Sequence, residues 1–223
     1  MTEPADPSRS MVQRAPEVAG GLLRQLLELA IDGRGPLPSA KAAAARQLQL
    51  KGDHESAVSA LITAHVGLAS AQGFLTNLGG LITLPVALPT NLAGAAIVQM
   101  RMIAAVAHLR GYDINDPRVR TALTLCMLGE EEVRAHVSDG RLPSTPLGLA
   151  TAPVFDPKLD RQVSERVLGG LAAKVGGKHV VVLFAKRIPL VGGGVGAVND
   201  GWLTYALGDY ARREFVSRRR GRN

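Results

Sequence analysis

The sequence predicts an all-α protein, and three observations lead to that fold class. Apolar side chains recur every three or four residues in several segments, which is the spacing of one helix face. Residues typical of helix N-termini stand directly before those segments. Only residues 179–184, "HVVVLF", have the pattern of a strand, and one isolated strand forms no sheet.

The chain of 223 residues is long enough to bury a substantial core. We expect a disordered tail over residues 1–15, a single helical domain over residues 16–217 and a basic tail over residues 218–223. Within the domain, Pro16 opens the first periodic segment and Gly33 closes it, because proline suits the start of a helix and glycine its end.

Four further helix starts are indicated by capping residues. Ser39 and Asp53 each precede a helical segment, where a side-chain oxygen can accept a hydrogen bond from a free amide of the first turn. Asp116 and Asp156 are each followed by proline, whose missing N–H costs nothing at the first helical position. Residues 138–156 contain three prolines and two glycines without helical periodicity, which predicts a long internal loop.

A long stretch without charge, residues 56–100, contains no Asp, Glu, Lys or Arg. Two apolar arms flank Pro85 and Pro89, which predicts a proline-hinged hydrophobic hairpin over residues 58–110. Arg101 stands near the middle of the second arm, and a central arginine costs about 2.5–3.5 kcal/mol on membrane insertion. The sequence therefore disfavours two membrane passes. It leaves open a hairpin packed against the other helices and one that dips partway into a membrane face.

Arg101 lies on the same helix face as Gly94 and His108, which are each seven residues away. If that face is buried, the guanidinium requires an acidic partner, since an unpaired buried charge is very costly. Asp200 and Asp209, both in the last predicted helix, are the candidates for this buried ion pair.

Small residues recur every three or four positions along the last predicted helix. Such a stripe lets another helix approach closely, so we expect the hairpin to pack against it. The expected helix-packing residues are Gly193, Ala197, Gly201 and Gly208, together with Pro85 and Pro89 of the hinge. The glycines at 192, 194 and 196 do not match a G-x-G-x-x-G turn, and no cofactor is expected.

Basic residues are concentrated at the C-terminus of a chain whose net charge is +7. Six arginines are opposed there only by Asp209 and Glu214: Arg212, Arg213, Arg218, Arg219, Arg220 and Arg222. They fit either a solvated helix end or contact with anionic lipid, whereas an aromatic content of 4% disfavours nucleic acid as a partner. Nearby Trp202 and Tyr205, one turn apart, are either interfacial anchors or ordinary packing residues.

No catalytic residue is identified in the sequence, and no metal site is expected. His54 begins a segment similar to a zinc-binding helix, but Val58 occupies the position that needs a second histidine. Glutamates 130–132 fit the first turn of a helix, where carboxylates complement the helix dipole. Cys126 lies in an apolar run and is expected to be a buried, inert thiol.

Three blocks of the chain resemble the bacterial EcsC family. They are "GFLTNLGGLITLPVALPTNL" at residues 73–92, "RMIAAVAHLRGYDINDPRVRTALTLCMLG" at residues 101–129, and "KRIPLVGGGVGAVNDGWLTYALGDYARREFVSRR" at residues 186–219. The family is named for a member encoded beside the two components of an ABC exporter. The resemblance implies a helical, hydrophobic protein of the bacterial cytoplasm or its membrane surface, and it defines no catalytic residue.

These observations favour a non-enzymatic accessory protein that is membrane-associated or linked to transport. Its expected partners are an anionic membrane surface or an ABC transporter. Its expected location is the cytoplasm or the inner face of the cytoplasmic membrane, without secretion. Two alternatives stay open: a soluble, hydrolase-like enzyme with a cleft between the hairpin and the loop at residues 138–156, and a cytosolic protein-interaction module.

Overall fold

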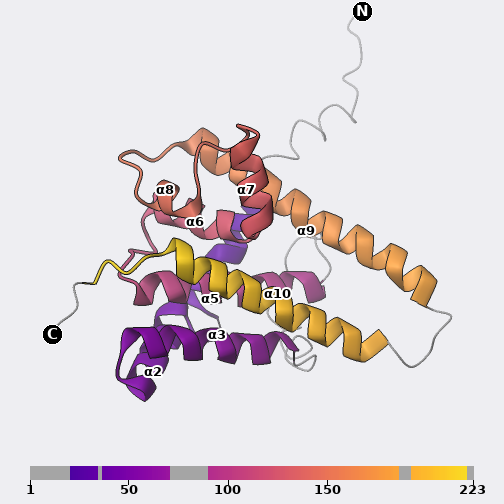
Figure 1. Ribbon diagram of the computed structural model, residues 1–223, viewed down its shortest axis with the longest axis horizontal. Helices are drawn as coiled ribbons and strands as arrows, with labels where there is room; N and C mark the ends of the chain where they lie inside the picture. The colour runs from indigo at the N-terminus through magenta and orange to yellow at the C-terminus, as the bar shows by residue number, and fades with distance from the viewer. Residues whose placement is uncertain (1–20, 35–36, 71–89, 186–191, 220–223) are drawn as a thin grey trace, which may run out of the picture.

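The computed structural model in Figure 1 describes residues 21–34, 37–70, 90–185 and 192–219, with the backbone alone for residues 90–93, 172–185 and 192–200. These ranges are helical and contain no strand, apart from one isolated bridge between Arg34 and Leu37. The all-α prediction is confirmed.

The helices follow one another in the order seen in Figure 1. A helix over residues 21–32 comes first. It is followed by α2 (Ala40–Lys51), α3 (His54–Ser70), α5 (Thr90–Leu109), α6 (Pro117–Cys126), α7 (Glu130–Ser138), α8 (Pro146–Ala150), α9 (Pro157–Ala185) and α10 (Gly192–Glu214).

The strand-like residues 179–184 belong to the last part of α9. The strand pattern at this position is therefore corrected to helix. A single strand would leave its backbone N–H and C=O groups unpaired, whereas a helix pairs them within the segment. The local preference of valine for strands is too weak to offset that cost.

The predicted capping residues begin their helices as expected. Ser39, Asp53, Asp116 and Asp156 each accept a hydrogen bond from a backbone amide two or three residues further on, at 2.8–3.0 Å. Gly33 ends the first helix in the left-handed region, with φ at 72°, a conformation that favours glycine.

The segment at residues 138–156 contains one helical turn, α8, which packs against α6. Two hydrogen bonds hold it to the rest of the protein. The carboxylate of Glu214 accepts from the amide of Leu147 at 2.9 Å, and Arg118 Nη1 donates to the carbonyl of Ala152 at 2.6 Å. The segment is thus anchored to α6 and α10.

Helix α5 is the centre of the fold. Helices α2, α3, α6 and α10 all pack against it, and its residues 102–107 are fully buried around the whole helix circumference. A helix surrounded on every side can be apolar on every face. Residues 96–100, which end the uncharged stretch, are likewise buried in the protein's own core, whereas α3 is buried on one face only. The hinge with Pro85 and Pro89 lies outside the described residues.

The hairpin helices α3 and α5 pack against each other and against α10, as the sequence predicts. Helix α10 comes very close to α3 at two glycines. A Cβ atom on Gly201 would lie 2.5 Å from Ser70 Oγ, and one on Gly208 would lie 2.9 Å from Ile62 Cγ2. Of the other predicted packing residues, Gly193 and Ala197 lie in the part of α10 described by its backbone alone.

Candidate functional site

Arg101 lies deep in the core, with 2% of its surface exposed. Its Nε–H donates to His65 Nε2 at 3.2 Å, and its Nη1 donates to the carbonyl oxygen of Pro38 at 3.4 Å. Burial lowers the pKa of the guanidinium to about 10, so it stays charged at neutral pH. The buried cation of Arg101 therefore donates its hydrogen bonds to two neutral acceptors.

The expected pair between Arg101 and Asp209 is not formed. The Asp209 carboxylate accepts hydrogen bonds from Arg212, at 2.6 Å, and from Arg213. The Asp209 side chain is 19% exposed and lies against these two arginines of its own helix. The side chain of Asp200, the other candidate, lies outside the described side chains.

His65 is a hydrogen-bond partner of Arg101 that was not predicted from the sequence. Its Nδ1–H donates to the carbonyl of Leu61 at 2.8 Å, which leaves Nε2 as the acceptor for Arg101. Burial, and then the charge of Arg101, lower its pKa from 6.5 to about 4. One signal was available in the sequence: His65 continues the apolar face of α3 that includes Val58 and Leu61.

An exposed aromatic pair marks the outward face of α10. Trp202, the only tryptophan of the chain, is 69% exposed, and Tyr205 is 48% exposed. Their ring centroids lie 6.1 Å apart. The packing interpretation of this pair is wrong, because neither ring enters the core. Two neighbouring exposed rings form an apolar patch, and exposed apolar patches are a feature of surfaces that contact a partner or a membrane.

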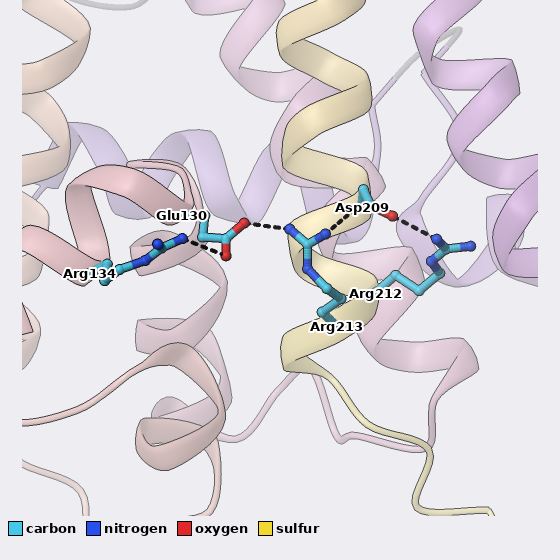
Figure 2. Close-up of polar contacts among 5 residues, drawn as sticks. All are labelled: Glu130, Arg134, Asp209, Arg212 and Arg213. Atoms are coloured by element: carbon cyan, nitrogen blue, oxygen red, sulfur yellow. Dashed lines mark hydrogen bonds and ion pairs between the residues drawn. The ribbon is translucent and has the colours of Figure 1, made fainter.

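One turn further along α10, a chain of alternating charges connects this helix to α7, as Figure 2 shows. Glu130 accepts from Arg134 at 2.9 Å and from Arg213 at 2.5 Å, and Arg213 and Arg212 both bind Asp209. The Glu130, Arg134 and Arg213 side chains are 41–72% exposed, so the two pairs of Glu130 contribute at most about 1 kcal/mol each, whereas the Asp209 side chain is 19% exposed. Their main effect is to fix the direction of the arginines.

The C-terminal segment folds back onto the end of α5. The Arg218 guanidinium lies 4.8 Å from the ring centroid of Tyr112, a cation–π distance. Arg219 donates from Nε to the carbonyl of Leu109 at 3.0 Å and from Nη2 to that of His108 at 3.3 Å. Arg219 thus satisfies carbonyl groups that the end of a helix leaves unpaired.

These contacts bear on the arginines expected to touch lipid. Arg212, Arg213, Arg218 and Arg219 each have an intramolecular partner. Arg220 and Arg222 lie outside the described residues. Lipid contact by this group stays a prediction.

One end of the molecule is formed by helix segments without carboxylates. Helix α9 ends and α10 begins there, and α5 begins at the same end (Figure 1). Helix α5 contains no Asp or Glu, and neither does α9 after Glu165 nor α10 before Asp200. The corresponding part of α9 contains Lys174 and Lys178, which are four residues apart and share a helix face.

Neither a metal site nor a membrane-spanning helix is found among the described residues. No group of three or more His, Cys, Asp or Glu side chains among them is placed to hold a metal ion. No helix in the described ranges has the length and apolarity needed to cross a bilayer. Cys126 is buried as predicted, and burial raises the pKa of its thiol well above the ordinary value, so it is not a reactive nucleophile.

Comparison of the chain with models of known protein families, with curated proteins and with solved structures gives no match in any of the three. The resemblance to the EcsC family therefore depends on the sequence blocks alone.

Proposed function

We propose that this protein is an EcsC-like, non-enzymatic accessory protein that associates with an anionic membrane surface on its cytoplasmic side. The contact is made by the end of the molecule at which α9 ends and α10 begins, extended along the outward face of α10 to Trp202 and Tyr205 at its middle. The observation that carries the proposal is the exposed pair of Trp202 and Tyr205 at the middle of α10, which follows the half of that helix that contains no carboxylate before Asp200. Tryptophan and tyrosine are enriched where protein meets the lipid headgroups, because their rings are apolar and their tips polar.

The distribution of charged residues also favours a membrane contact at the α9–α10 end. An anionic bilayer repels carboxylates, and each lysine near its surface contributes about 1 kcal/mol. Lys174 and Lys178 would together contribute about 2 kcal/mol, which corresponds to about a 30-fold change in partitioning. The C-terminal arginines lie at the opposite end of α5, a helix of 20 residues and about 30 Å. Contact through the α9–α10 end and contact through the tail are therefore alternative orientations.

The single tryptophan provides a direct measurement. We expect the Trp202 emission of the full chain to shift to shorter wavelength with phosphatidylglycerol-containing vesicles and to stay unchanged with pure phosphatidylcholine vesicles. The shift should weaken as salt is added, since salt screens surface charge. An unchanged emission at low salt, together with no co-flotation of protein and anionic vesicles, would refute the proposal.

Charge-matched variants locate the contact. The pair Lys174→Gln and Lys178→Gln should weaken partitioning by about 30-fold. The control pair Lys41→Gln and Lys51→Gln, at exposed positions on α2, should leave it unchanged.

The tail is tested by Arg220→Gln with Arg222→Gln. These two changes leave in place the contacts of Arg218 and Arg219 with the end of α5, which a truncation would remove. A loss of vesicle binding larger than that of the α9 pair would place the membrane contact at the tail instead.

A further inference from the structure

A separate cavity of about 300 Å³ lies between the helix at residues 21–32, the start of α6 and the start of α9. It is formed by segments that take no part in the α9–α10 end proposed above. Its volume is at the lower limit of small-molecule sites, which suits a ligand of one ring or a short chain with one polar group.

Part of the cavity wall is apolar. Leu23 and Leu27 of the first helix are almost completely buried and line one side, and Phe155, just before α9, lines another. This wall can shelter the hydrocarbon part of a ligand.

Arg120 of α6 supplies a cationic donor at the cavity, where it forms an ion pair with Glu28 but no direct hydrogen bond from Nη2 to a described residue. Its Nη2 is buried and has no hydrogen-bond partner in the described part of the chain. The nearest carboxylate oxygen, Glu28 Oε1, lies 3.7 Å from Nη2, which is beyond hydrogen-bond distance. A buried donor without a partner destabilises the folded protein, so an acceptor at this position would relieve that cost.

Ser164 of α9 supplies a second donor. Its residue surface is only 7% exposed, it lines the same cavity, and its hydroxyl makes no hydrogen bond to a described residue. The neighbouring hydroxyls are used differently. Thr124 donates to the carbonyl of Arg120 at 3.0 Å, and Thr121 donates to the carboxylate of Asp160 at 2.6 Å. Asp160 is thereby held in place. Arg24 and Asn115 also line the cavity, but both residues are exposed, so the buried donors among the described lining residues are those of Arg120 and Ser164.

A guanidinium N–H and a hydroxyl that line one cavity together with an apolar wall match one class of ligand. We propose that this cavity binds a small organic oxyanion, a carboxylate or a phosphate monoester. Its charged oxygens accept hydrogen bonds from Arg120 and Ser164, and its apolar part lies against Leu23, Leu27 and Phe155. Arg120 is the main determinant of affinity, because hydrogen bonds between a guanidinium and an oxyanion are charge-assisted.

The test uses the ¹⁵N-labelled full chain titrated with phenylacetate, phenyl phosphate, benzyl alcohol and inorganic phosphate. At least one of the two aromatic anions should bind saturably and shift the amide signals of Asn115, Arg120 and Ser164. Benzyl alcohol lacks the charge and inorganic phosphate lacks the apolar part, so both should bind at least tenfold more weakly. Comparison of the two aromatic anions decides between a carboxylate and a phosphate ligand.

Variants test the named donors. Arg120→Gln should weaken binding of the better anion by about tenfold or more, and Ser164→Ala by about threefold to tenfold. The control Arg134→Gln removes an exposed arginine of another ion pair and should leave binding unchanged. The proposal is overturned if neither anion binds saturably to the wild type, if benzyl alcohol binds as well as the anions, or if the shifted signals lie outside the cavity. Equal affinity of wild type and a folded Arg120→Gln protein would overturn it too.

Discussion

At the scale of single residues, the main result is that a buried arginine is held by a histidine. His65 lies 36 positions before Arg101 and comes from the preceding helix of the hairpin. A neutral imidazole accepts one hydrogen bond from the guanidinium and donates another to the backbone, so both ring nitrogens are satisfied. The arrangement requires the histidine to stay unprotonated.

This requirement predicts a pH dependence of stability. The pKa of His65 is about 4 in the folded protein and 6.5 ordinarily, so the stabilising contribution of the neutral ring is complete above pH 6.5. As the pH falls from 6.5 to about 4, the unfolded chain takes up the proton first and about 3 kcal/mol of stability is lost. Urea unfolding at several pH values should show a shallower dependence for His65→Gln than for wild type. Equal slopes for the two proteins would contradict the assignment.

A double-mutant cycle separates the observed partner of Arg101 from the one expected from sequence. Arg101→Met with Asp209→Asn should be additive within about 0.5 kcal/mol, because the two side chains do not meet. Arg101→Met with His65→Leu should give a coupling of about 1–2 kcal/mol in the free energy of unfolding. Coupling of Arg101 to Asp209 without coupling to His65 would show that Arg101 pairs with Asp209, as the sequence predicts.

At the scale of elements, the close approach of α10 to the hairpin depends on glycine. The helix starts and the small-residue stripe could be predicted, because capping and spacing are properties of adjacent residues. The strand-like pattern at residues 179–184 gave a wrong prediction, because these residues form a strand only where a partner strand is present to pair with them.

Two glycine substitutions should change stability in opposite directions. In Gly208→Ala the new methyl group would lie 2.9 Å from Ile62 Cγ2 and 3.1 Å from Met102 Sδ, so we expect a loss of about 1–3 kcal/mol. In Gly169→Ala the methyl group meets nothing within 4 Å, so the better helix propensity of alanine should stabilise by about 0.5–1 kcal/mol. Urea unfolding of both variants measures the difference. A neutral Gly208→Ala would mean that α10 is not closely packed against α3.

At the scale of the whole molecule, α5 joins the parts of the fold, because α2, α3, α6 and α10 all pack on it. The fold class and the hairpin that contains α5 followed from the sequence. The sequence did not show whether α5 is surrounded by other helices or by lipid, because burial in a protein core and burial in lipid both select uncharged residues.

A shared central helix predicts one cooperative unfolding transition. Trp202 reports on α10, Cys126 on α6 and far-UV circular dichroism on all helices. In urea, the tryptophan emission, the thiol labelling and the helical signal should change together. An earlier transition of Trp202 would show instead that α10 separates from α5 before the rest unfolds.

The sequence by itself determined the helical class, the four helix starts at Ser39, Asp53, Asp116 and Asp156, the buried thiol and the close packing of a small-residue helix. These features depend on residues near one another in the chain. Only the tertiary structure decided the partner of Arg101, the exposure of Trp202, the docking of Arg219 on α5 and the cavity at Arg120. Each of these depends on which helix faces meet, and residues far apart in the chain determine that through packing.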